Sequence, residues 1–393
     1  MPKPKIAIMT FVHAYNYGAE LQCFALQEKL SQLGYDVTVL DLFRPGDDEY
    51  KNIQGDHRFD RLFSYNDNKD KKVRLKIVIA RWINYIVSFF YTKRAKKRDR
   101  AFKEFHNQYT RLSEEKYYNF QSLYDKAFWP YSHFIVGSDQ VWNYSLHFSN
   151  EPYFLTFVKN GKKISYAASI GHSDMPDKVK ELYKMWLSDF DYISLREQQG
   201  VSIVKEITHR EDAQCVLDPV LLFEKSDWIR ILDVKTEKEK YVLLYLLSRS
   251  QYSVDLAKSI AKEYSLKVVL ITTEIFNPYP GSGINVYYGR SPKDFVYLFA
   301  NASFVVTNSF HGTAFAVNFN IPFFSTTRRD KRYNSRFISL LENCKLSDRL
   351  LYEGQDYPKI ENVKDVSFRI ANNIIERDRE KSLSYLLSSI NNE

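Results

Sequence analysis

The sequence predicts an α/β protein built from two doubly wound, Rossmann-like domains that face each other across a cleft. Three observations support this prediction. Short runs of branched and aromatic residues alternate with helical patterns along the chain, as in parallel sheets covered by helices on both faces. These runs form two series, separated by the polar and charged stretch 233–240. A chain of 393 residues also has the length of two or three domains.

The first series defines an N-terminal domain, residues 1–234. Residues 5–11 have the apolar pattern of a buried first strand, and the helix after it is expected to end at Gly34, because glycine is a common C-terminal cap. The later strand candidates are equally short and apolar, and they lie at 35–42, 133–136, 163–168, 192–195 and 216–217.

The second series defines a C-terminal domain, residues 235–393, which includes a helical pattern at 363–387. Its strand candidates lie at 241–247, 267–273, 285–288, 304–307 and 321–325. In open α/β sheets, ligands bind outside the carboxyl ends of the strands. We therefore expect a ligand cleft where the carboxyl ends of the two sheets face each other.

Positive charge is concentrated in one segment. Residues 69–103 contain 13 Lys or Arg and 2 Asp, a net charge of +11 in a chain whose total is +8, so the remainder is net −3. This argues against nucleic-acid binding and for a local anionic partner. The insertion 69–105 has an apolar centre, 77–91, that is too short to span a bilayer. It fits a helix on an anionic membrane surface, or a core helix with solvated ends.

The chain has three cysteines, Cys23, Cys215 and Cys344. They are too few and too widely spaced for a disulfide framework or a zinc site. A reducing cytosol is therefore the expected compartment. The first residues lack the apolar region of a secretion signal. No metal-binding motif and no glycine-rich nucleotide motif occurs, so neither a metal nor a cofactor is expected.

The segment 304–324, FVVTNSFHGTAFAVNFNIPFF, predicts a strand, a turn, a helix and a second strand. In the turn 307–314, Ser309, Gly312 and Thr313 leave backbone N–H groups available, and the helix dipole adds to their attraction for an anion. His311 lies at the mouth of this turn, where an imidazole can donate a proton near neutral pH. A histidine that only caps the helix fits the spacing equally well.

Two further turns carry polar groups. In 133–143, HFIVGSDQVWN, a strand runs into Ser138, Asp139 and Gln140. Asp139 is placed to orient a sugar hydroxyl or to act as a base, although taken alone an Asx-turn or helix cap is the more common role. The first loop, 11–22, is analogous in position to a phosphate-binding turn but lacks its glycines, which favours a polar acceptor.

Arginines follow strand ends near these turns. Guanidinium groups suit phosphates and carboxylates because they bind both in a bidentate manner. A single surface arginine is more often only solvated, but several cations lie together just beyond the His311 helix. The candidates are Arg196, Arg328, Arg329, Arg332 and Arg336.

Six segments together resemble the polysaccharide pyruvyl transferase family, in the family's order and over residues 5–341: FVHAYNYGAELQCFALQ, FIVGSDQVWN, YAASIG, ISLREQQG, CVLDPVLL and TNSFHGTAFAVNFNIPF. The resemblance implies a GT-B-like fold. It also implies transfer of pyruvate from phosphoenolpyruvate onto two hydroxyls of a sugar, which forms a cyclic ketal. The product would belong to a bacterial cell-surface polysaccharide, such as a capsule or exopolysaccharide.

The resemblance assigns roles to the candidate residues. His311 is expected to be the general acid, with Asp139 as a second catalytic group. Many relatives carry arginine where this chain has Ser309, so another arginine must replace it. The expected donor site comprises Arg196, Ser309, Phe310, Gly312, Thr313, Arg328, Arg329, Arg332 and Arg336. The expected acceptor site comprises Asn16, Tyr17, Gly18, Ser138, Gln140 and Trp142.

The expected partners are phosphoenolpyruvate as co-substrate, a lipid-linked or polymeric glycan acceptor, and an anionic membrane surface contacted through 69–103. The protein would then be cytoplasmic and peripheral at the inner face of the cell membrane. Two alternatives remain at this point. A nucleotide-sugar glycosyltransferase of the same fold would leave His311 without a clear task. A non-enzymatic membrane scaffold would give no reason for polar groups at several strand ends.

Overall fold

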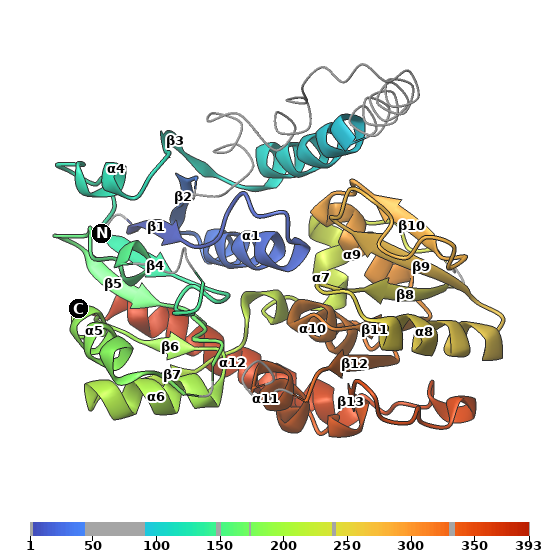
Figure 1. Ribbon diagram of the computed structural model, residues 1–393. Helices are drawn as coiled ribbons and strands as arrows, with labels where there is room; N and C mark the ends of the chain where they lie inside the picture. Colours follow the sequence, from blue (N-terminus) through green and yellow to red (C-terminus); the bar gives the residue numbers. More distant parts are fainter. Residues whose placement is uncertain are drawn as a thin grey trace, which may run out of the picture.

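The computed structural model describes residues 3–43, 91–146, 151–172, 174–237, 241–329 and 335–392. It contains two parallel sheets in separate lobes, each covered by helices (Figure 1). The N-terminal sheet has the order β3-β2-β1-β4-β5. Its strands are β1 (Lys5–Met9), β2 (Asp36–Leu42), β3 (Leu112–Tyr117), β4 (His133–Val136) and β5 (Lys162–Ser165). A short parallel pair, β6 (Ser194–Leu195) and β7 (Gln214–Cys215), continues this lobe through isolated bridges.

The C-terminal sheet repeats the pattern with the order β10-β9-β8-β11-β12-β13. Its strands are β8 (Tyr241–Tyr245), β9 (Lys267–Thr272), β10 (Asn285–Tyr288), β11 (Phe304–Thr307), β12 (Phe323–Thr327) and β13 (Leu350–Tyr352). The predicted doubly wound domains are therefore confirmed. In both sheets the strand order reverses beside the first strand, between β1 and β4 and between β8 and β11. Such reversals create the crevice in which α/β proteins bind ligands.

The helices connect these strands, and α1 (Tyr17–Gln32) begins with an N-cap at Asn16. The Asn16 side chain accepts hydrogen bonds from the N–H groups of Gly18 and Ala19. The chain leaves α1 through Gly34 at φ +86°, as predicted for a glycine cap. The other helices are α4 (Gln121–Tyr124), α5 (Asp177–Leu187), α6 (Gln198–Thr208), α7 (Lys225–Ile231), α8 (Gln251–Glu263), α9 (Pro292–Asn301), α10 (Phe310–Asn318), α11 (Ser335–Asn343) and α12 (Arg369–Asn391).

Helix α12 packs on a different domain from the one predicted. The C-terminal domain 235–393 was expected to include it, but α12 crosses back and packs on the N-terminal lobe (Figure 1). The Tyr385 hydroxyl donates to the Ser165 carbonyl, and the Leu217 N–H donates to Ser382 Oγ. The apolar side chains Leu386 and Ile390 join the core that contains β1 and β4. Neither β3 nor β13 was predicted, because β3 has a polar sequence and β13 is only three residues long.

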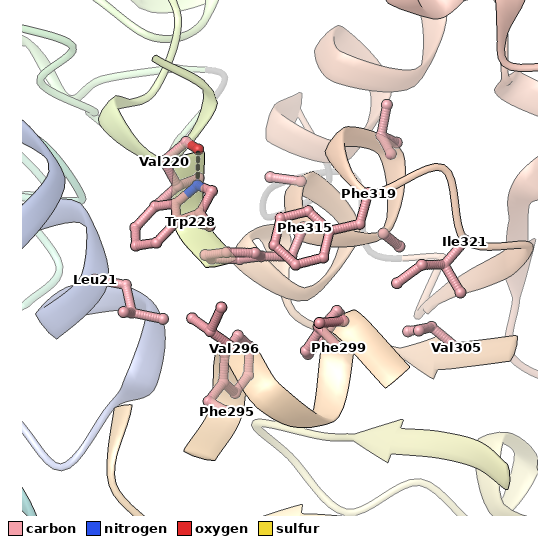
Figure 2. Packing of buried hydrophobic residues seen from close by; sticks show 14 of the residues in the cluster. Leu21, Val220, Trp228, Phe295, Val296, Phe299, Val305, Phe315, Phe319 and Ile321 are labelled. Atoms are coloured by element: carbon pink, nitrogen blue, oxygen red, sulfur yellow. Dashed lines mark hydrogen bonds between the residues drawn. The ribbon is translucent and has the colours of Figure 1, made fainter. Parts of the chain in front are cut away.

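An apolar core joins the two lobes directly below the switch points. Leu21 of α1 faces Trp228 of α7 and Val296 of α9, and Phe315 of α10 packs on Trp228 (Figure 2). Trp228 Nε1 also donates to the Val220 carbonyl at 3.1 Å. Interfaces between domains move easily unless they are large and apolar. This core therefore fixes α1 against α10, the two helices that begin at the cleft.

The insertion 69–105 is described only from residue 91, and its earlier part lies outside the described residues. Residues 91–109 form one helix (Figure 1). Phe102 and Phe105 are buried in the core beside α1, while Arg94 donates to the Ile275 carbonyl in the C-terminal lobe. The end of the insertion thus packs on protein. No helix within the described ranges is long and apolar enough to cross a membrane.

Candidate functional site

The site residues lie where the carboxyl ends of the sheets meet. Asp139 lies in the loop after β4, while Gly18 and His311 lie in the first turns of the helices that follow β1 and β11, so all three are beside the two switch points. His311 and Gly18 are in direct contact: a Cβ built on Gly18 would lie 2.2 Å from His311 Nδ1 and 2.7 Å from His311 Cβ. Only glycine allows this approach between α1 and α10.

The turn that carries His311 is closed by its own side chains. Ser309 caps α10 by accepting a hydrogen bond from the Gly312 N–H at 3.3 Å. Thr307 Oγ1 accepts from the Ser309 N–H at 3.1 Å and donates to the Tyr245 carbonyl. Two N–H groups of the turn are therefore used internally. The anion cradle predicted from N–H groups is therefore smaller than expected, and an anion bound there would need a further cation.

Neighbouring residues of the turn have structural tasks. The Thr313 hydroxyl bonds to the Ser309 carbonyl and to Ser325 Oγ, so it points into the domain. A Cβ on Gly312 would lie 2.3 Å from Thr307 Oγ1, which makes glycine necessary there. The Phe310 ring lies 4.5 Å from the guanidinium carbon of Arg196, close enough for a cation–π contact.

Arg196 is the centre of a buried ionic network. Its side chain is 0% exposed, and it donates to Asp218 Oδ2 at 2.8 Å and to Asp139 Oδ1 at 3.0 Å. Ser138 Oγ also donates to Asp218 Oδ2, at 3.0 Å. Because the Arg196 guanidinium is enclosed by these groups, it positions the carboxylates. The sequence had suggested instead that it binds the donor directly.

Both carboxylates remain ionised. Burial alone would raise the pKa of Asp218, but the His311 ring and the Arg196 guanidinium outweigh it and hold that pKa well below its usual range. Burial likewise opposes ionisation of Asp139, yet Arg196 and His311 lower its pKa too. Asp218 Oδ2 lies 3.5 Å from His311 Nε2, so a negative charge stands beside the imidazole.

Arg336 of α11 is the predicted arginine that the structure brings to this network. It makes no hydrogen bond or ion pair with another described residue, and its Nε is buried without a partner. Burial, together with repulsion by Arg196, lowers the pKa of Arg336 to about 10, although Asp139 and Glu197 pull the other way. A buried guanidinium whose charge is disfavoured in this way can form a favourable ion pair with an anionic ligand.

The other predicted arginines lie elsewhere. Arg328 is 74% exposed and pairs with Glu353 at 3.5 Å, and Arg329 is also exposed. Arg332 lies outside the described residues. Position in the sequence alone did not separate Arg336 from these neighbours.

Most of the predicted acceptor residues are engaged in contacts within the protein. Asn16 caps α1, Ser138 belongs to the ionic network, and Gln140 Oε1 accepts from Asn143 at 2.7 Å. Tyr17 is buried between the lobes, where its hydroxyl donates to the Arg290 carbonyl. Trp142 is fully buried, stacks on Phe154 and donates to the Tyr153 carbonyl, so it is a core residue and not a ligand contact.

Two site residues were missed from sequence. Asp218 begins the 3₁₀ turn Pro219–Leu221 and accepts from the Val220 N–H, while Glu197 accepts from Ser169 Oγ and the Ile170 N–H. An acidic residue inside the apolar run CVLDPVLL was the available signal, because a carboxylate is rarely buried without a partner.

The fold and this site define a class: a GT-B-type protein of two Rossmann-like domains, with its polar centre between them. A putative UDP-N-acetylglucosamine 2-epimerase from Listeria monocytogenes superimposes with a TM-score of 0.51 at 10% identity, over 100% of this chain and 98% of that one. Another UDP-N-acetylglucosamine 2-epimerase gives 0.50 at 10% identity, over 99% and 96%. At such identities the likeness shows the fold alone. No curated protein matches the chain by sequence.

The sequence also identifies the family. The sequence model of the polysaccharide pyruvyl transferase family matches residues 16–330, which is most of the chain. The chain belongs to the polysaccharide pyruvyl transferase family. The matched range contains Gly18, Asp139, Arg196, Asp218 and His311, so the whole ionic network except Arg336 falls inside it.

Proposed function

We propose that this protein transfers pyruvate from phosphoenolpyruvate to two hydroxyls of one sugar and leaves a cyclic ketal. The observation that carries the proposal is the position of His311. Its imidazole is buried between the two domains, beside the Asp218 carboxylate, and the same network includes a cation, Arg336, that pairs with no carboxylate of the described residues. A proton donor next to an anion anchor is what an enol phosphate requires.

The reaction balances with these groups. His311 protonates the methylene carbon of phosphoenolpyruvate, and positive charge develops at C2. One sugar hydroxyl forms a C–O bond to C2 and loses its proton, which restores the protonated imidazole. The C–O bond to phosphate then breaks, the second hydroxyl bonds to C2, and its proton leaves with phosphate. The products are the ketal, with a new methyl group, and hydrogen phosphate.

The remaining charges fit the same sequence of steps. Arg336 is assigned to the carboxylate or phosphate of the donor, in place of the arginine that many relatives carry at position 309. Asp139, which stays ionised, is assigned to orient the second attacking hydroxyl and to pass its proton on to the departing phosphate. Arg196 and Asp218 are positioning residues, because they reach the substrate only through Asp139 and His311.

The acceptor is proposed to be a sugar of a cell-surface polysaccharide precursor, polymeric or lipid-linked, with no resident metal or cofactor. Contact with an anionic membrane through 69–103 also stays a proposal, because most of that segment lies outside the described residues. Sedimentation with vesicles that contain or lack anionic lipid tests it. Equal sedimentation with both kinds of vesicle would argue against the membrane role.

The deciding experiment measures phosphate release from phosphoenolpyruvate with a galactose-bearing lipid acceptor. Replacement of His311 by Ala should lower the rate about 10²- to 10⁴-fold, the usual contribution of a general acid. His209→Asn is the matched control, because His209 is an exposed helix cap at φ +56° that asparagine also tolerates. An active His311→Ala variant, or transfer from a UDP-sugar without phosphoenolpyruvate, would overturn the proposal.

A further inference from the structure

A cavity lies in the N-terminal domain, outside the His311 site. It has a volume of about 310 Å³ and opens between the loop after β1, the end of β2 and the helix 91–109. Its lining includes His13, Asp41, Phe43, Lys103, His106 and Lys116. None of these residues has a task in the proposed reaction. The volume is at the lower end of small-molecule sites, roughly 300–1,000 Å³, so the cavity suits a single sugar-sized group.

The inner wall of the cavity is held in place by two imidazole–carboxylate pairs. His13 Nε2 lies 2.5 Å from Asp41 Oδ1, and His106 Nε2 lies 2.7 Å from Glu20 Oε2. Asp41, Glu20 and His106 are all at most 4% exposed. The His13 ring is stacked between His106 and Phe43, at centroid distances of 5.0 and 4.2 Å. Polar groups fixed in this way are prepared to bond sugar hydroxyls.

The charges around the opening leave a positive excess. Of the acidic residues in the lining, Asp41 pairs with His13 and Asp99 pairs with Arg98. Lys103 and Lys116 are exposed at the rim, and neither has an ion-pair partner among the described residues. A ligand that fills the cavity therefore meets two ammonium groups that form no ion pair with any carboxylate in the described part of the chain. That environment favours a phosphate or other anionic group.

The cavity and the His311 site share one loop. His13 and Tyr15 line the cavity, and Gly18, three residues further along, contacts His311. An acceptor bound in the cavity therefore contacts the loop that leads to the Gly18–His311 contact. Phosphoenolpyruvate is an unsuitable occupant because the cavity is separate from the histidine that must protonate it.

We propose that this cavity binds the phosphate-bearing sugar of the acceptor, with Asp41 and His13 bonding hydroxyls and Lys103 and Lys116 bonding the phosphate. The proposal rests on the proposed function for the identity of the acceptor, but binding is testable without turnover. Glucose 1-phosphate, glucose, glucuronate and inorganic phosphate are titrated by calorimetry into the full chain and into a Lys103→Glu, Lys116→Glu double variant.

The wild type should bind glucose 1-phosphate more tightly than glucose or inorganic phosphate, and the double variant should bind it at least about tenfold more weakly. Lys93→Glu, Lys96→Glu is the matched control: it makes the same charge change on the helix that carries Lys103, away from the cavity. Tighter binding of glucuronate would place a sugar carboxylate in the site and overturn the phosphate assignment. Unchanged binding in the double variant would overturn the site itself.

Turnover separates this inference from the proposed function. Loss of the cavity's lysines should raise KM for a phosphate-bearing acceptor and leave phosphoenolpyruvate binding unchanged. If the wild type binds glucose 1-phosphate through the lysines yet never releases phosphate from phosphoenolpyruvate, the proposed function fails and the cavity assignment stands. If phosphate is released at equal KM by wild type and double variant, the function stands and the cavity assignment fails.

Discussion

The imidazole of His311 rests on the backbone of Gly18, which leaves no room for a methyl group between them. Gly18 belongs to the first helix of one domain and His311 to the helix after the fourth sequential strand of the other. The contact thus joins the two predicted halves of the site. It also gives a reason for glycine after Asn16-Tyr17 that differs from phosphate binding: the glycine is there to admit the histidine.

Gly18→Ala should abolish most activity. The new Cβ would lie 2.2 Å from Nδ1 and 2.7 Å from Cβ of His311, so the whole side chain must move. Overpacking of this kind costs about 1–3 kcal/mol of stability, while a displaced general acid should cost roughly 10²-fold in kcat. Phosphate release and thermal unfolding measure the two effects. Full activity in this variant would show that His311 does not work from its observed position.

Arg336→Leu should separate stability from function. Burial and Arg196 already disfavour the Arg336 charge, and its removal should raise Tm of the ligand-free protein by a few degrees. Donor binding should weaken about 10- to 100-fold, since a charge-assisted pair with phosphoenolpyruvate is lost. Calorimetry with phosphoenolpyruvate and a thermal scan test both parts. A lower Tm with unchanged donor affinity would contradict the assignment.

Arg328→Leu is the matched comparison for that variant. It removes the same charge from the same predicted cluster, but Arg328 is 74% exposed and pairs with Glu353. Exposed ion pairs contribute about 0–1 kcal/mol, so Tm should hardly change. Donor affinity should stay within about twofold of wild type, the range expected when a distant surface charge is lost.

The sequence was sufficient to locate most of the strands along the chain, but not the elements they pack against at long range. Residues 5–11, 241–247 and 304–307 were recognised because parallel strands are apolar throughout. Strand β3 was missed because it lies at the edge of its sheet, where LSEEKY can stay polar. The return of α12 to the N-terminal lobe depends on contacts such as Tyr385 with Ser165, which no local pattern records.

The candidate site was predictable to the same degree. The turns that carry Asp139 and His311 were found because polar residues follow apolar strands there. The sequence did not predict which arginine reaches these turns, because Arg336 and Arg328 have similar sequence surroundings. Arg336 lies in α11 and is buried beside Arg196, whereas Arg328 follows β12 and is exposed. Asp218 was hidden by its apolar neighbours until the structure placed it against Arg196.

Asp218→Asn should damage both the fold and the reaction. The change removes the carboxylate that pairs with Arg196 at 2.8 Å and leaves that guanidinium partly unpaired in the interior. Breaking a buried ion pair costs about 3–5 kcal/mol. Urea unfolding should show this loss. A fall in kcat for the protein that stays folded would show that Asp218 positions His311, whereas a merely structural pair would leave that kcat unchanged.

Acid should unfold the protein through the same carboxylates. The pKa of Asp218 and that of Asp139 are both lower in the folded protein than the ordinary value of 3.8. Below that value the unfolded chain binds protons before the folded one, so the free energy of unfolding should fall as pH decreases from about 4. Above pH 5 it should be nearly independent of these two groups. Chemical unfolding from pH 6 to pH 2 tests the sign, and the Asp139→Asn variant should show a shallower decline than wild type. An equally steep decline in that variant would mean that acid acts on other carboxylates.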